Sequence, residues 1–150
     1  ADLLREMVKG WTIAPILLDP AEGDTVKRAA FRAADVAIAA SGTVSLELAA
    51  ARTPMVITYR MNPLTYAIIR RMAITDTVTL VNLVADSRTV PEFLGPDCRP
   101  ELIVPAALNL LKDPRAQDAA MALTMERLGE GGEDPGLRAA RAVIARLPSR

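Results

Sequence analysis

The sequence predicts an α/β fold, in which a parallel sheet is followed by trailing helices. In the first half of the chain, short apolar runs alternate with helical patterns, and from residue 100 onward the pattern is helical only. The run at residues 36–40 is apolar throughout, as is typical of strands buried on both faces of a parallel sheet. This alternation predicts βαβ units with right-handed crossovers.

Each expected element is bounded by turn or capping residues. Asn62 is a plausible N-cap, and Pro63 suits the first turn of the helix that follows it. Strands are expected at 14–18, 36–40, 55–59 and 77–81. Helices are expected at 23–34, 44–51, 63–72, 101–111, 115–128 and 137–147, with a Gly-rich linker at 129–136. Because ligands of such sheets bind at the carboxyl ends of strands, the informative loops follow residues 40, 59 and 81.

The composition limits the classes of function. Apolar residues make up 51% of the 150 residues and aromatics only 3%, so the core must consist of Ala, Val, Leu, Ile and Met. Eighteen basic residues balance eighteen acidic ones, which argues against nucleic-acid binding. No histidine and no divalent-metal motif is present, so we expect neither a metal nor a cofactor. No apolar stretch has the roughly 18 residues that span a membrane.

The turn Ser41-Gly42-Thr43 is the sharpest candidate site, because it joins an apolar strand to a helix. Gly42 lets a ligand approach the backbone closely. Free N–H groups at the helix start favour an anion such as a diphosphate. Glu47 lies four residues beyond Thr43 on the same helix face, where a carboxylate can accept hydrogen bonds from ribose hydroxyls. The alternative is a plain βα turn with capping hydroxyls and a surface Glu.

Four blocks of sequence, at residues 33–47, 53–65, 78–84 and 90–94, resemble the lipid-A-disaccharide synthases in order and spacing. The resemblance implies a GT-B fold of two Rossmann-like domains, the second of which binds the nucleotide. It implies that this chain is the C-terminal half of such a glycosyltransferase. Residues 1–98 would form a partial UDP-sugar-binding domain without its first strand, and residues 99–150 the helices that complete it.

The resemblance also implies a reaction. UDP-2,3-diacylglucosamine would be the donor and 2,3-diacylglucosamine 1-phosphate the acceptor, with UDP released. By position, residues 41–43 would hold the diphosphate, Glu47 the ribose, and Arg60 would add positive charge beside phosphate. Asn82 would lie near the reacting sugars as the candidate catalytic residue, in the loop after the 77–81 strand. The main base would belong to an N-terminal domain outside this chain, so the chain alone is expected to be inactive.

Three departures from the family pattern concern the Asn82 loop and its surroundings. Val81 stands where the family has Pro, residues 86–88 replace a Gly-Arg pair, and Gly95 stands where Gln is common. Glu92 lies in a matched block, but no role can be assigned to it. Without the resemblance, Asn82 would be interpreted as an ordinary turn residue, and Arg60 as a solvated side chain.

Two segments bear on possible interactions of the chain. Residues 63–72 combine Leu, Ile and Met with two Arg residues; such a helix can lie on the inner membrane surface or pack on the sheet. The resemblance implies that subunits can exchange their C-terminal helices, and the linker at 129–136 would permit such a homodimer. We expect a cytoplasmic protein, which contacts the inner membrane if the helix at residues 63–72 lies on its surface.

Two other functions remain as alternatives. One is another GT-B UDP-sugar enzyme, such as an N-acetylglucosaminyltransferase or an epimerase. The other is a non-catalytic nucleotide-binding module.

Overall fold

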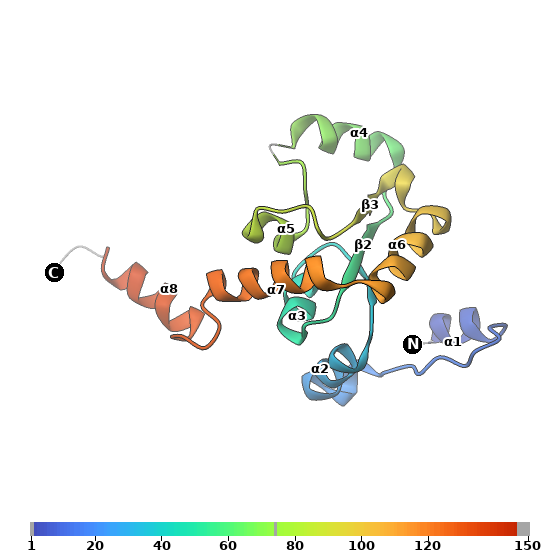
Figure 1. The fold of residues 1–150 in the computed structure, drawn as a ribbon, viewed down its shortest axis with the longest axis horizontal. Helices are drawn as coiled ribbons and strands as arrows, with labels where there is room; N and C mark the ends of the chain where they lie inside the picture. The colour runs from blue at the N-terminus through green and yellow to red at the C-terminus, as the bar shows by residue number, and fades with distance from the viewer. Residues whose placement is uncertain (1, 74, 147–150) are drawn as a thin grey trace.

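A computed structural model describes residues 2–73 and 75–146 of the chain (Figure 1). A small sheet lies at the centre with helices around it, while the N-terminal helix and the last helix project away from it on opposite sides. The elements are, in order, α1 Asp2–Val8, η1 Pro20–Glu22, α2 Asp24–Ala33, β1 Ala37–Ala40, α3 Val44–Ala51, β2 Met55–Tyr59, α4 Pro63–Met72, α5 Leu80–Ala85, β3 Glu92–Leu94, η2 Gly95–Asp97, α6 Pro100–Lys112, α7 Arg115–Leu128 and α8 Pro135–Ile144.

The sheet has three parallel strands in the order β1-β2-β3. Ala37 pairs with Met55, and Ile57 pairs with Glu92. The carboxyl ends of the strands therefore meet at one edge, where residues 41–43, Arg60 and η2 follow them. The predicted fold class, an α/β fold with a Rossmann-like parallel sheet and trailing helices, is confirmed.

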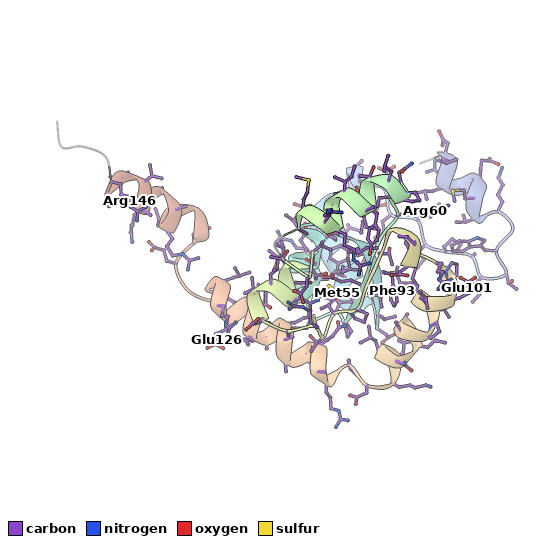
Figure 2. The ribbon with its side chains drawn as sticks, turned by 90° about the horizontal axis from the view of Figure 1, so that it is seen from above. Met55, Arg60, Phe93, Glu101, Glu126 and Arg146 are labelled. Carbon is purple, nitrogen blue, oxygen red and sulfur yellow. The ribbon has the colours of Figure 1, made fainter. Side chains whose placement is uncertain are left out.

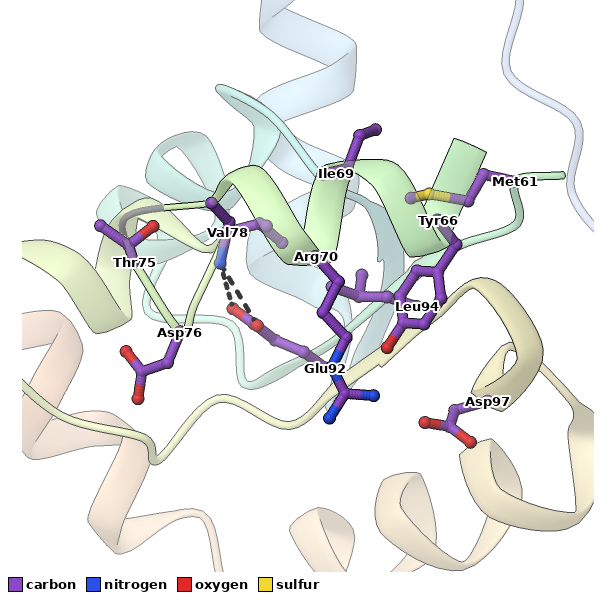
Figure 3. A pocket seen from close by; sticks show the side chains of 11 residues that line it. Met61, Tyr66, Ile69, Arg70, Thr75, Asp76, Val78, Glu92, Leu94 and Asp97 are labelled. Atoms are coloured by element: carbon purple, nitrogen blue, oxygen red, sulfur yellow. Dashed lines mark hydrogen bonds between the residues drawn. The ribbon is translucent and has the colours of Figure 1, made fainter. Parts of the chain in front are cut away.

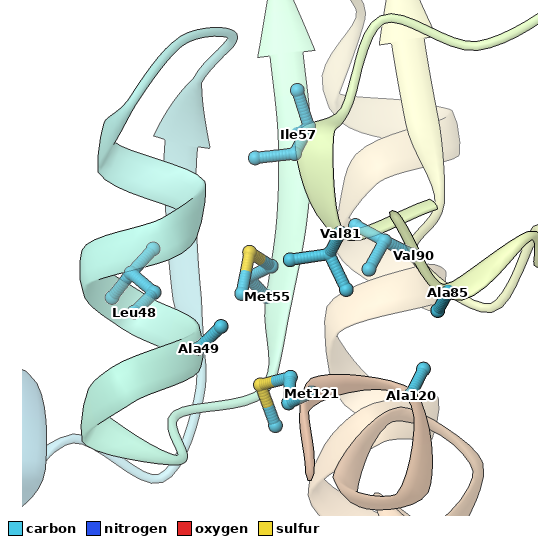
Figure 4. Close-up of a cluster of buried hydrophobic side chains, with 9 residues drawn as sticks. All are labelled: Leu48, Ala49, Met55, Ile57, Val81, Ala85, Val90, Ala120 and Met121. Carbon is cyan, nitrogen blue, oxygen red and sulfur yellow. The ribbon is translucent and has the colours of Figure 1, made fainter. Parts of the chain in front are cut away.

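The core lies between the sheet and helices α3, α5 and α7, and its side chains are shown in Figure 4. Helix α7 packs against both α3 and α5, while α6 packs against β2. The side chains of this core are aliphatic or methionine, as the scarcity of aromatics predicts. The cluster consists of Leu48, Ala49, Met55, Ile57, Val81, Ala85, Val90, Ala120 and Met121.

Residues 14–18 do not form the predicted strand. They are extended chain outside any sheet, and the side chain of Ile16 is 89% exposed. A strand needs a neighbour to satisfy its N–H and C=O groups, and no strand of the described chain pairs with this segment. An apolar run is therefore not sufficient to predict a strand.

Residues 77–81 do not form a strand either; the chain is irregular up to Thr79, and helix α5 begins at Leu80. The carboxylate of Glu92 explains this, because it accepts hydrogen bonds from the N–H groups of Val78 and Thr79 just before the helix. A tertiary contact thus overrides the strand propensity of Thr and Val. The third strand is instead β3, which the sequence analysis did not predict.

The C-terminal helices are close to those predicted. Helix α7 has the expected bounds of residues 115–128. Helix α8 begins at Pro135 rather than Leu137, because Asp134 is its N-cap and accepts hydrogen bonds from Gly136 N and Leu137 N at 2.8 and 3.1 Å. The helix ends at Ile144, earlier than the predicted end at Leu147, a residue that itself lies outside the described part of the chain.

Candidate functional site

The turn after β1 has a backbone that only glycine adopts without strain. Gly42 has φ +143°, and a Cβ at this position would have no atom within 4 Å. The requirement is therefore conformational and not a lack of space. The carbonyl of Gly42 accepts hydrogen bonds from Ser45 N at 3.2 Å and Ser45 Oγ at 2.9 Å, which fixes the turn to the first turn of α3.

Backbone donors at the start of α3 have no acceptor. Within the described residues, the N–H groups of Gly42, Thr43 and Val44 donate to no protein atom, and Thr43, the N-cap, makes no side-chain cap. Gly42 and Thr43 are exposed. Unused N–H groups at a helix N-terminus attract anions, both through direct hydrogen bonds and through the helix dipole.

Glu47 lies one turn along α3, and its carboxylate is already paired. Lys27 Nζ of α2 is 2.8 Å from Glu47 Oε2 and 3.2 Å from Asp24 Oδ1. The hydrogen bond to Glu47, followed by that to Asp24, raises the pKa of Lys27 above its ordinary value. Sequence reasoning missed Lys27, because its spacing predicts the contact with Asp24 but not the one between two helices.

Arg60 follows the last residue of β2 and is exposed, near the start of α4 (Figure 2). It forms no ion pair with the other residues that the structure describes. The structure therefore places Arg60 at the same sheet edge as residues 41–43, with its positive charge uncompensated.

Asn82 is not in a loop, contrary to the prediction, but within α5, where it is 1% exposed. Its Oδ1 accepts a hydrogen bond from Val90 N at 3.0 Å, and its Nδ2 donates to Val90 O at 2.9 Å and to Thr77 Oγ1 at 3.2 Å. A buried amide that is fully used in this way holds two segments together. Its predicted place near the reacting sugars stays a prediction.

Glu92, to which the sequence analysis gave no role, organises the same region. Its carboxylate accepts hydrogen bonds from Thr79 N at 2.8 Å, from Val78 N at 3.1 Å and from the hydroxyl of Thr77. Asn82 Nδ2 lies 3.4 Å from the same Oε1 atom. We call Thr77, Asn82, Val90 and Glu92 the clamp, because together they tie the start of α5 to β3.

A cavity of about 570 Å³ lies beneath α4, between this helix, β3 and the segment that leads to α5 (Figure 3). The ring of Tyr66 forms part of its wall and lies against Gly95, where an added Cβ would be 2.7 Å from the ring carbons. The full lining is Met61, Tyr66, Ile69, Arg70, Ala73, Thr75, Asp76, Val78, Glu92, Leu94 and Asp97. Sequence reasoning did not predict this cavity.

Comparison with known proteins assigns the chain to a family. The family model described as lipid-A-disaccharide synthetase matches residues 14–143. A lipid-A-disaccharide synthase of Ruegeria pomeroyi is 60% identical over 99% of this chain and 38% of its own length. Those of Paramagnetospirillum magneticum and Rhodospirillum centenum are 44% and 40% identical, over 96% and 100% of this chain and 37% of their own lengths. The chain thus spans little more than a third of these relatives, and it belongs to the lipid-A-disaccharide synthetase family.

Proposed function

We propose that the chain binds the UDP part of a nucleotide-sugar donor at the turn of residues 41–43. The observation that carries this proposal is the set of unused N–H groups at Gly42, Thr43 and Val44, which lie at the carboxyl edge of the sheet. Of these residues, Gly42 and Thr43 are exposed. The diphosphate would accept hydrogen bonds from these groups, with Arg60 adding positive charge. Glu47 would accept hydrogen bonds from ribose hydroxyls, remaining near Lys27.

For the complete enzyme we propose the reaction that the family resemblance implies. Diacylglucosamine would pass from UDP-2,3-diacylglucosamine to 2,3-diacylglucosamine 1-phosphate, and UDP would leave. The N–H groups of the turn and Arg60 would stabilise the negative charge on the departing diphosphate. The base that activates the acceptor hydroxyl would come from the part of the relatives that this chain does not span. Residues 1–98 would carry the donor site, and residues 99–150 would complete the domain around it.

We further propose that the outward face of α4 meets the inner membrane surface from the cytoplasmic side. The alternative, that α4 packs its apolar residues on the sheet, is contradicted: Leu64, Ile68 and Met72 are 71%, 51% and 76% exposed. Arg71 lies on this helix and α4 carries no acidic residue, which suits an anionic lipid surface. None of the described helices is long and apolar enough to cross a membrane.

A homodimer by helix exchange is proposed for α8. Figure 1 shows this helix beyond the end of α7, away from the sheet. Its Leu137, Val143 and Ile144 side chains are 49%, 62% and 66% exposed. A second subunit would cover these side chains, and light scattering that reports a dimer, lost on deletion of residues 135–146, would support the exchange.

Titration of the chain with UDP tests the donor site. We expect binding that weakens about tenfold in Glu47→Gln, since a charge-assisted hydrogen bond to the ribose is lost. Glu126→Gln is the matched control, because Glu126 is an exposed glutamate on α7, away from the carboxyl edge of the sheet (Figure 2). The folded chain failing to bind UDP, or equal weakening in both variants, would contradict the proposal.

A further inference from the structure

The cavity beneath α4 lies at the same sheet edge as the proposed UDP site. Met61, which lines it, directly follows Arg60, and Asp97, on its other side, belongs to the turn that follows β3. The turn of residues 41–43 follows β1, the strand on the other side of β2. A ligand held at that turn can therefore extend along the edge, past β2, toward the cavity.

The walls of the cavity are largely apolar. Helix α4 supplies Tyr66, with Ile69 at the rim; β3 supplies Leu94, and Met61 and Val78 close the sides (Figure 3). The Tyr66 ring can lie where it does because Gly95 has no side chain. At about 570 Å³, the volume falls within the range of small-molecule sites.

Two of the four charged residues that line the cavity, Asp76 and Glu92, are bonded to other protein groups. Asp76 accepts two hydrogen bonds from the guanidinium of Arg88, which lower the pKa of its carboxyl. The carboxylate of Glu92 accepts hydrogen bonds from the N–H groups of Val78 and Thr79. Arg70 and Asp97 remain, one positive and one negative charge. The cavity is thus slightly acidic, which disfavours an anionic ligand.

We propose that this cavity receives an acyl chain of the donor while its UDP part is held at the turn. The proposal rests on the proposed function and adds the part of the donor that the cavity takes. Apolar walls favour a hydrocarbon chain, and the carboxylate of Glu92 is held by N–H groups of the protein. Arg70 is placed to donate a hydrogen bond to the carbonyl that joins the chain to the sugar. The sugar would lie between the two sites, near Met61.

Ile68 and Ile69 offer a matched pair of variants for the test. They are adjacent on α4, identical in type and 51% and 48% exposed, yet only Ile69 lines the cavity. In Ile69→Trp the larger side chain crowds the rim of the cavity, whereas in Ile68→Trp it extends from the outward face. Each variant is titrated with UDP, UDP-N-acetylglucosamine and a short-chain UDP-2,3-diacylglucosamine, with circular dichroism as the check on folding.

We expect the acylated donor to bind the unchanged chain more tightly than UDP does. Ile69→Trp should weaken its binding about tenfold, the change expected when about two methylene groups lose their burial. Binding of UDP and of UDP-N-acetylglucosamine should not change, and Ile68→Trp should leave all three affinities as they were. Failure of the chain to bind UDP would contradict the donor site itself, which is a different result.

Equal effects of the two substitutions, or weaker UDP binding in Ile69→Trp, would overturn the acyl site. A second measurement does not depend on the folding of a variant. A donor with a photoreactive group at the end of its acyl chain should label peptides that contain Met61 or Ile69 of the unchanged chain. Labelling confined to α8 or to residues 2–18, where exposed apolar side chains also lie, would overturn the proposal too.

Discussion

The turn after β1 and the clamp between α5 and β3 use their polar groups in opposite ways. In the turn, the N–H groups of Gly42, Thr43 and Val44 have no acceptor within the described residues. In the clamp, the amide of Asn82 and the carboxylate of Glu92 are each used by two or more partners. The difference separates polar groups that are available to a ligand from those that hold the fold, and the sequence alone does not make this distinction.

A second amide supports this division. Gln117 of α7 is 1% exposed; its Oε1 accepts a hydrogen bond from Met55 N, and its Nε2 donates to Met55 O, both at 2.8 Å. The amide of Asn82 makes the same pair of hydrogen bonds with the N–H and C=O of Val90. In both cases a helix side chain satisfies the two backbone groups of one residue that would otherwise be buried without partners.

The largest effect is expected for Asn82→Ala. It leaves the N–H and C=O of Val90, a residue that is 2% exposed, without partners. Loss of buried partners of this kind should lower the free energy of unfolding by about 3 kcal/mol. Urea unfolding of the unchanged chain and of the variant measures this difference in free energy. An unchanged free energy of unfolding would contradict the structural role of the clamp.

A smaller loss of stability is expected for Glu92→Ala. Val78 N and Thr79 N lose their acceptor, but Glu92 is only half-buried, so water can replace part of what is lost. We expect about 2 kcal/mol in the same urea experiment. Because both substitutions act on one network, the double variant should lose less than the sum of the two single losses. Simple additivity would show that the two residues act independently.

The sequence predicts much of the fold, because the 37–40 and 55–59 strands and helices such as 115–128 depend on local pattern. It fails at residues 14–18 and 77–81, where the outcome depends on whether a distant partner is present. At residues 77–81 the partner is Glu92, which lies 13 residues beyond Thr79 and accepts a hydrogen bond from its N–H group. The candidate turn was predictable because its strand, glycine and helix start are adjacent in sequence, whereas Lys27 and the cavity depend on how separate helices pack.

Gly42→Ala tests the turn by strain rather than by lost contacts. An alanine at φ +143° is unfavourable although the space is open, so stability should fall by about 1 kcal/mol. The turn would relax toward negative φ and move the N–H groups, so UDP binding should weaken more than in Glu47→Gln. Titration with UDP measures the affinity, and urea unfolding measures the free energy of unfolding. Unchanged UDP affinity in a strained turn would show that the anion binds elsewhere.

The smallest effect is expected for Lys27→Met, which removes the partner of Glu47. Both side chains are about 40% exposed, at 43% and 41%, so the pair should add little at neutral pH. Because Glu47 and Asp24 raise the pKa of Lys27 above 10.5, the pair stabilises the fold below that pH, and its contribution is lost as the pH rises through the raised value. The difference in Tm between the unchanged chain and Lys27→Met should therefore be small at pH 7 and disappear in strong alkali.

Lys112→Met is the control, since Lys112 has no carboxylate partner among the described residues. If Lys27→Met instead destabilised the chain as much as Asn82→Ala does, the pair of Lys27 and Glu47 would hold the fold. Glu47 would then not belong to the polar groups that are available to a ligand.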